Sequence, residues 1–292
     1  MDVSIIIVSY NTRGVLLDCL KSIYQNAGEV SFEVIVVDNA SKDGTEDEIT
    51  KLKYPNFTYI QNKQNLGFSK ANNVGIKKSK GSYVLFLNPD TKLHKDTLSE
   101  MIKFMDQAKD CGAATCKVLL PNGKIDDASH RGFPTPWNSF THFSGLSKIF
   151  PKSKILNGYN LGNLDLSKTH EIDVLAGAFM MVGRQVGEKV GWWDEDYFFY
   201  GEDIDFCYML KQNGYKIYYM PTCSILHLKG VSGGLKKVSK HITTADKETK
   251  KRASKARFSA MRIFYKKHYE QKYPWVLTRL VYLGIFLKQL TS

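Results

Sequence analysis

The sequence predicts an α/β fold, with a mostly parallel sheet flanked by helices and a helical appendage at the C-terminus. Short apolar, β-branched runs alternate with helical patterns over the first third of the chain, and polar turns follow these runs. A strongly basic helical pattern lies toward the end of the chain. The alternation is typical of βαβ units, which place neighbouring strands in parallel.

The first elements follow one another regularly. We expect strands at 3–8, 32–37, 57–61 and 82–87, and helices at 13–26, 44–53 and 68–79. Each strand candidate is a short apolar run, as expected for a strand that is covered on both faces. Next, a helical pattern at 95–109 leads to apolar residues at 112–120.

The second half is less regular. Residues 121–170 are rich in Gly, Pro, Asn, Ser and aromatic residues without a clear period, which indicates a long excursion. Regular patterns then predict strand-like residues at 172–182, a helix at 202–213, a strand at 216–220 and an apolar run ending near His227. The basic region from about 236 is expected to be an appendage. We therefore divide the chain into a main domain, 1–230, and an extension, 231–292.

Length and composition indicate a globular protein. With 292 residues, of which 43% are apolar, the chain is long enough to bury a core. Its five cysteines form no CxxC pair and lie mostly among apolar neighbours, which disfavours a disulfide framework or a zinc site and suits a reducing compartment. Residues 3–8 follow without a basic segment or cleavage site, so we expect a first strand rather than a signal peptide.

The net charge of +12 is concentrated in one block. Residues 229–272 contain 14 Lys and Arg against three acids, or +11. Such a block suits nucleic acid, an anionic membrane surface or plain solvation. The apolar, aromatic segment 275–288 favours the membrane surface, because it is too short and too charged to span a bilayer. The alternative is a helix that packs on the core or on a partner subunit in a homo-oligomer.

The turns after the predicted strands carry polar side chains. Ser9, Tyr10 and Asn11 follow the first strand, and Asp38 follows the second. In open α/β sheets ligands bind beyond the carboxyl ends of the strands, so these turns face one crevice. Asp38 is suited to accept hydrogen bonds from a nucleobase or a ribose. Turn and capping chemistry explains the same residues without a ligand.

Two later turns add to this pattern. Asn65, Gly67 and Asn73 lie at a helix entry where backbone N–H groups can approach phosphate or ribose. Neither a GxGxxG fingerprint nor a GK[ST] loop is present there, which argues against NAD enzymes and P-loop ATPases. Asn88-Pro89-Asp90 follows the fourth strand, where Asp90 suits a metal or a diphosphate, although the tripeptide is also good turn chemistry.

An acidic helix start follows an aromatic run. Glu202, Asp203 and Asp205 come directly after Tyr197-Phe198-Phe199-Tyr200-Gly201. Burial beside aromatic residues and like charges raises the pKa of a carboxylate toward the range that a general base needs. The alternative is an acidic first turn that complements the helix dipole.

Taken in order, these motifs resemble the inverting glycosyltransferases of glycosyltransferase family 2, which have the GT-A fold with a Rossmann-like sheet. The motifs are VSYN, VVDNASKDGT, NLGFSKANNVG, LFLNPDT, LAGAFMMV, WWDEDYFFYGEDIDF and a final His. The resemblance covers about residues 3–230. The subgroup it looks most like is the rhamnosyltransferase-like enzymes of bacterial surface polysaccharide synthesis.

The resemblance implies a role for each matching residue on the donor side. Asp38 would pair with the nucleobase of a sugar nucleotide, beside Ser9, Tyr10 and Asn11. Positions near the ribose and diphosphate would be Asn65, Gly67 and Asn73. The donor sugar pocket would be lined by Ala176 and Gly177.

The resemblance also implies a metal site, a base and an acceptor site. Asp90 ends the tripeptide in the family's DxD place and would meet a divalent cation, Mg²⁺ or Mn²⁺, with His227 as second protein ligand. Asp203 would take the proton from the acceptor hydroxyl. Trp193 and Glu202 are expected at the acceptor, with core packing and a structural role as their alternatives. Asn88 departs from a strict DxD, and the lost charge should weaken the cation site.

The implied function is transfer of a sugar from a nucleotide-diphosphate sugar to a glycan or lipid-linked acceptor. dTDP-rhamnose is the favoured donor and UDP-hexoses remain open. The enzyme would lie in the cytoplasm, peripherally on the inner face of the cell membrane, without binding nucleic acid. A nucleotidyltransferase would need a Gly-rich basic loop after the first strand, which is missing. A non-catalytic sugar-nucleotide or polysaccharide binding protein is the alternative from another class.

Overall fold

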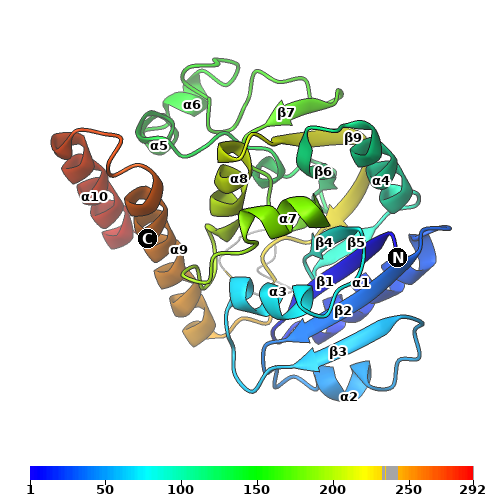
Figure 1. Ribbon diagram of the computed structural model, residues 1–292. Coiled ribbons are helices and arrows are strands. Elements are labelled where there is room, and N and C mark those ends of the chain that lie inside the picture. The colour runs from blue at the N-terminus through cyan, green and yellow to red at the C-terminus, as the bar shows by residue number, and fades with distance from the viewer. Residues whose placement is uncertain (232–233, 235–242, 292) are drawn as a thin grey trace.

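The structure, a computed structural model, describes residues 1–231, 234 and 243–291. In this part of the chain a nine-stranded sheet has the order β3-β2-β1-β4-β8-β6-β9-β5, with β7 paired to β9. The strands are β1 Val3–Ser9, β2 Phe32–Asp38, β3 Phe57–Gln61, β4 Tyr83–Leu87, β5 Thr91–Leu93, β6 Cys111–Leu119, β7 His170–Ile172, β8 Phe179–Gly183 and β9 Lys216–His227. The fold class is the predicted one, with a central sheet between helices (Figure 1).

Parallel pairing holds for β1 to β4 and gives way to mixed pairing beyond them. Ser9 at the end of β1 lies beside Asp38 at the end of β2, and β4 pairs with the other edge of β1. Strand β8 is antiparallel to both β4 and β6. It starts beside the end of β4, where the Asn88 N–H donates to the Ala178 carbonyl (3.1 Å), so it runs back along β4.

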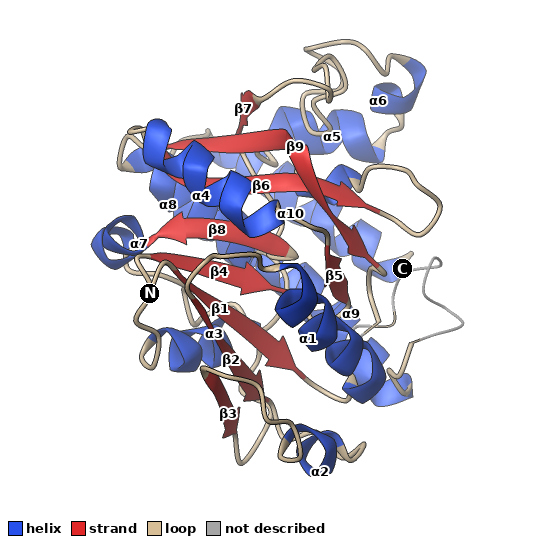
Figure 2. Cartoon of the chain, turned by 90° about the vertical axis from the view of Figure 1, so that its right-hand side faces the viewer, coloured by secondary structure: helices blue, strands red, loops and turns tan. Residues whose placement is uncertain are grey.

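Helices cover both faces of the sheet. They are α1 Arg13–Asn26, α2 Thr45–Ile49, α3 Phe68–Ile76, α4 Thr97–Gln107, α5 Pro136–Phe143, α6 Leu146–Ile149, α7 Arg184–Val190, α8 Glu202–Gln212, α9 Lys247–His268 and α10 Trp275–Leu290. Side chains alternate along β1, so Ile5 and Ile7 pack with α1 and α4, whereas Ile6 packs in the layer that contains α8. Figure 2 shows α1 and α4 on one side of the sheet and α8 on the other.

Several predicted boundaries are corrected. The pattern at 44–53 is helical only at Thr45–Ile49, and the strand expected over 172–182 is two separate strands, β7 and β8. The strand at 216–220 and the later run are one strand, β9, which continues past a shift in its register with β6. A bulge of this kind kinks a strand without ending it. The excursion 121–170 contains α5, α6 and the 3-10 turn Asp127–Ser129.

The C-terminal helices pack in series on the sheet domain. The Tyr208 ring of α8 meets Phe264 of α9 edge to face, with centroids 5.8 Å apart. Helix α10 in turn packs on α9, where the Tyr265 hydroxyl lies 3.1 Å from Thr278 Oγ1. The division at 230/231 stays a prediction. Of the predicted basic helix, residues 232–233 and 235–242, like 292, lie outside the described residues.

Two further properties concern the chain as a whole. No helix in the described ranges is both long enough and apolar enough to cross a membrane. The five cysteines are free and buried, and they lie in α1, β6, α8 and β9: Cys19, Cys111, Cys116, Cys207 and Cys223.

Candidate active site

A cavity of about 1420 Å³ lies beyond the ends of β1, β4 and β9, beside the start of α8 and between faces of α5, α9 and α10. Ten of the predicted site residues line it: Tyr10, Asn65, Gly67, Asn88, Asp90, Ala176, Gly177, Glu202, Asp203 and His227. Five others do not: Ser9, Asn11, Asp38, Asn73 and Trp193. The volume exceeds the about 300–1,000 Å³ of a typical small-ligand pocket, so there is room for two substrates.

Asp38 is buried and holds the turn that follows β2. The N–H and hydroxyl of Ser41 donate to its carboxylate over 2.9 and 2.5 Å. Burial raises the pKa of Asp38, and these two hydrogen bonds oppose the rise. The Asn11 N–H donates to the Ser41 hydroxyl (2.8 Å), and Ser9 is fully buried, so these side chains fasten two turns together. Tyr10 is the member of this group that faces the cavity.

Gly67 allows the chain before α8 to approach α3 closely. Its φ is +85°, and an added Cβ would lie 2.5 Å from the Phe198 carbonyl oxygen, so only glycine fits. The Asn65 carboxamide accepts from the Gly67 N–H (2.9 Å). Asn73 donates to the Trp193 carbonyl (2.9 Å), which explains why it is directed away from the cavity.

Asp90 and His227 are brought together by the pairing of two strands. Thr91 of β5 is opposite His227 of β9, and this register places His227 Nε2 3.4 Å from Asp90 Oδ1. The nitrogen is buried and has no hydrogen-bond partner. Burial alone lowers the pKa of His227, but the nearby carboxylates of Asp90 and Asp126 raise it to about 9. Asn88 lines the cavity beside this pair.

Asp126, which sequence reasoning missed, completes this arrangement. Its Oδ2 lies 3.2 Å from His227 Nδ1, and its other oxygen accepts a hydrogen bond from Lys229. The contact of Asp126 with Nδ1 would keep a proton on that nitrogen if a cation replaced the proton on Nε2, as in carboxylate–histidine–metal triads. No group of three His, Cys, Asp or Glu side chains among the described residues is arranged to hold a metal. A cation at Asp90 and His227 would have to take its remaining ligands from a diphosphate and water.

The acidic start of α8 meets an arginine from the excursion. Arg131 Nη2 donates to Asp203 Oδ2 over 2.8 Å, and both side chains are 14% exposed. Glu202 points one oxygen, Oε2, into buried surroundings without a partner. Burial, followed by the charge of Asp203, raises the pKa of Glu202 to about 8. The two adjacent carboxyl groups thus have different environments: Asp203 is paired with an arginine, and Glu202 is buried with a raised pKa.

Trp193 corrects the expectation of an acceptor contact. It is 2% exposed, and its ring packs on Phe86 and Phe206 with centroids 4.7 and 5.3 Å apart. Its side chain packs in the core behind the cavity wall and does not line the cavity. An added Cβ on Gly177 would lie 3.4 Å from the Phe68 ring, an ordinary contact distance, so this glycine lies directly against the aromatic layer.

Positive side chains also line the cavity. Arg131 and Lys229 come from the two long connections, and Arg252 and Arg257 come from α9. Sequence reasoning missed them for two reasons. Some lie in connections that have no periodic pattern, and the others lie in the basic block that the sequence predicts to be a membrane-facing surface. Several cations beside a few acids suit a ligand that carries phosphate.

Comparison with known proteins identifies the family. The family model described as Glycosyl transferase family 2 matches residues 4–182. Rhamnosyltransferase WbbL of Escherichia coli (strain K12) is 28% identical over 234 residues, which are 77% of this chain and 83% of that protein. N-acetylglucosaminyl-diphospho-decaprenol L-rhamnosyltransferase of Mycobacterium tuberculosis is 26% identical over 234 residues, covering 76% of this chain and 75% of the relative.

Solved structures share the fold. Staphylococcus aureus TarS 1-349 in complex with UDP-GlcNAc has a TM-score of 0.56 and 16% identity, with 98% of this chain and 79% of that chain covered. GalNAc-T7 with UDP, GalNAc and Mn²⁺ has a TM-score of 0.58 and 16% identity over 78% of this chain, which spans 44% of the GalNAc-T7 chain. The matched motifs, the fold and the family model lead to one conclusion: the chain belongs to glycosyl transferase family 2 and is a rhamnosyltransferase-like glycosyltransferase of polysaccharide synthesis.

Proposed function

We propose that this enzyme transfers a sugar, with inversion, from a nucleoside-diphosphate sugar to a hydroxyl of a lipid-linked glycan. The observation that carries the proposal is that the Asp90–His227 pair and the Glu202–Asp203 pair line the same cavity. One pair suits a diphosphate with its cation, and the other suits an acceptor hydroxyl. Two substrates thus have one place to meet.

In this proposal Asp203 is the general base. It lines the cavity, and its ion pair with Arg131 holds one oxygen in place. Its other oxygen accepts from the Ile204 N–H (2.9 Å), so the carboxylate has a fixed orientation at the helix start. A positioned carboxylate can take the acceptor proton as the new bond forms on the face opposite the leaving group. Glu202, whose pKa is raised by burial, is assigned to acceptor binding through its unpartnered oxygen.

On the donor side, Asp90 and His227 would hold a divalent cation, Mg²⁺ or Mn²⁺. The cation would neutralise the negative charge that develops on the diphosphate as it leaves. Arg131 and Lys229 add positive charge to the same cavity. Tyr10, Asn65 and Gly67 are assigned to the nucleoside and its phosphates. Buried Asp38 and Ser9, together with the partly buried Asn11 and Asn73, support these turns and define where the nucleoside lies.

The likeness to two rhamnosyltransferases supports dTDP-rhamnose as donor. UDP-hexoses are the alternative, because the TarS and GalNAc-T7 structures contain UDP or UDP-GlcNAc. The mycobacterial relative is named for a diphospho-decaprenol acceptor, which supports a lipid-linked acceptor here.

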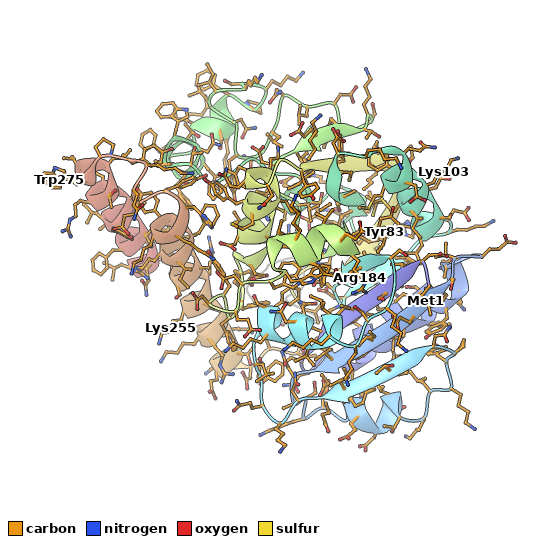
Figure 3. All side chains as sticks on the ribbon, in the orientation of Figure 1. Met1, Tyr83, Lys103, Arg184, Lys255 and Trp275 are labelled. Atoms are coloured by element: carbon orange, nitrogen blue, oxygen red, sulfur yellow. The ribbon has the colours of Figure 1, made fainter. Side chains whose placement is uncertain are left out.

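We further propose that the enzyme works in the cytoplasm at the inner face of the cell membrane. The outward face of α10 exposes Trp275, Val276 and Phe286, and α9 beside it is rich in Lys and Arg. Figure 3 shows Trp275 at the outer edge of the molecule, directed away from its body. Such a helix pair suits an anionic membrane surface. Pairing of this face with a second copy is the alternative.

Calorimetric titration tests the proposed function. The purified protein is titrated with dTDP-rhamnose and a panel of UDP- and GDP-sugars, each with Mn²⁺ and again with EDTA. We expect one donor to bind saturably and EDTA to weaken it. If EDTA does not change donor binding, Asp90 and His227 do not hold a cation that the donor needs. If no donor binds, the cavity is not a donor site.

A further inference from the structure

The active-site cavity continues into an apolar trough between α5 and α10. Three aromatic residues of α5, Trp137, Phe140 and Phe143, line it from one side. From the other side it is lined by one face of α10, including Leu277, Leu280, Gly284 and Leu287. These positions recur every three or four residues, so they form a single stripe along the helix.

The trough exposes apolar surface that folding leaves uncovered. Trp137, Phe140 and Phe143 are each about half exposed, as is Leu280 across the trough. Contiguous exposed apolar side chains on a folded protein mark a binding surface for an apolar partner. The trough is part of the cavity that contains Asp203, so a ligand lying in it has one end at the proposed base.

Positive charge lies where the trough joins the carboxylates. Burial raises the pKa of Tyr200, next to the acidic start of α8, to about 12, and the charge of Arg257 opposes the rise. On α5, burial lowers the pKa of His142, and the charges of Lys148, Arg257 and Lys288 lower it further. Arg257 therefore acts on both regions. Arg252 and Arg257 line the same cavity as the carboxylates and the apolar walls of the trough.

We propose that the trough binds the polyprenyl chain of a diphosphate-linked acceptor, with the diphosphate at Arg252 and Arg257. This assignment rests on the proposed function for its catalytic end. An amphiphile with an anionic head and a long hydrocarbon tail matches a cavity whose walls combine cations with aromatic and aliphatic side chains. A free membrane surface fits less well, because a concave trough between two helices cannot lie flat on a bilayer.

Two leucines of α10 provide a matched pair of variants. Leu280 lines the trough and Leu283 does not, yet they are 57% and 50% exposed. Leu280→Ser and Leu283→Ser therefore remove similar apolar surface, one inside the trough and one outside it. Gly284→Phe is the third variant, because an added Cβ at Gly284 meets nothing within 4 Å and the new ring would fill the trough. Replacing a helical glycine does not weaken the helix.

The test is equilibrium binding in detergent, with a long-chain polyprenyl diphosphate compared with geranyl diphosphate. We expect wild type to prefer the long chain. Leu280→Ser should weaken long-chain binding roughly tenfold, the loss expected when one partly buried leucine no longer contacts the lipid. Gly284→Phe should cause a loss of similar size by filling the trough. Both should leave geranyl diphosphate binding unchanged, and Leu283→Ser should match wild type.

Other outcomes overturn the assignment. Equal binding of both chain lengths by wild type would mean that no lipid chain is recognised. Equal losses in Leu280→Ser and Leu283→Ser would indicate that α10 adsorbs to micelles without use of the trough. The assay needs no sugar transfer, so it is independent of the proposed function. If the long-chain lipid binds but no donor does, the proposed function is rejected and the lipid assignment of the trough stands. If a donor binds but chain length has no effect, the proposed function stands and the lipid assignment is rejected.

Discussion

Arg131 and Asp203 form an ion pair that joins the irregular excursion to the first turn of α8. The guanidinium donates over 2.8 Å, and both side chains are mostly buried. Breaking a buried pair from one side is costly, because it leaves the other charge without compensation. The pair therefore connects the stability of the excursion to the position of the proposed base.

Asp203→Asn should keep donor binding and abolish transfer. The carboxamide can still accept a hydrogen bond from Arg131 but leaves its charge uncompensated, so we expect lower stability with the contact retained, and the carboxamide cannot take a proton. We expect kcat to fall by at least about 100-fold, with the donor Kd unchanged. Single-turnover assays and calorimetry on the same preparation measure the two quantities. Substantial remaining turnover would remove Asp203 from the role of base.

Glu202→Gln should change how stability depends on pH. The pKa of Glu202 is raised from 4.5 to about 8 in the folded protein, so the folded state favours the protonated form. Its contribution to stability is complete below pH 4.5 and is lost as the pH rises toward 8. Glutamine cannot ionise, so the variant should become more stable than wild type over this range, by on the order of a few kcal/mol at pH 8. Thermal unfolding at pH 5 and pH 8 measures this, and a difference independent of pH would contradict it.

Asp126→Asn should weaken cation binding without removing a proposed ligand. Asp126 holds His227 through Nδ1, and loss of such an outer carboxylate typically lowers metal affinity about 10- to 100-fold. Titration with Mn²⁺, followed by electron paramagnetic resonance, gives the affinity directly. Asp110→Asn, which removes only a surface ion pair with Lys216, is the control. Equal affinities in the two variants would show that Asp126 does not orient His227.

Gly67→Ala should destabilise the protein by about 2 kcal/mol or more, because its φ is positive and the new Cβ would collide with the Phe198 carbonyl. Gly14→Ala is the matched substitution. Gly14 lies in α1 with nothing within 4 Å of an added Cβ, so alanine should stabilise by up to about 1 kcal/mol. Chemical denaturation compares the two variants. Equal effects would mean that the close approach at Phe198 relaxes freely.

Sequence reasoning succeeded where structure is local. Strands β1 to β4 and their helices follow from short-range patterns, whereas the contact of His227 with Asp90 depends on the long-range pairing of β9 with β5. Sequence reasoning failed in the excursion, because Asp126 and Arg131 reach the site only through tertiary contacts. No periodic pattern in the sequence predicts such contacts. It was also wrong about Trp193, because a tryptophan beside a motif looks the same whether it faces a sugar or the core.

The buried cysteines allow local opening of the fold to be measured without the introduction of new cysteines. Burial raises the pKa of Cys19, Cys111 and Cys207 to about 12, so these thiols stay protonated and unreactive in the native state. An exposed thiol has an ordinary pKa near 8.5 and reacts readily with alkylating reagents. Cys19 lies in α1, Cys111 in β6 and Cys207 in α8. Alkylation followed by mass spectrometry therefore reports separately on the opening of three layers of the same domain.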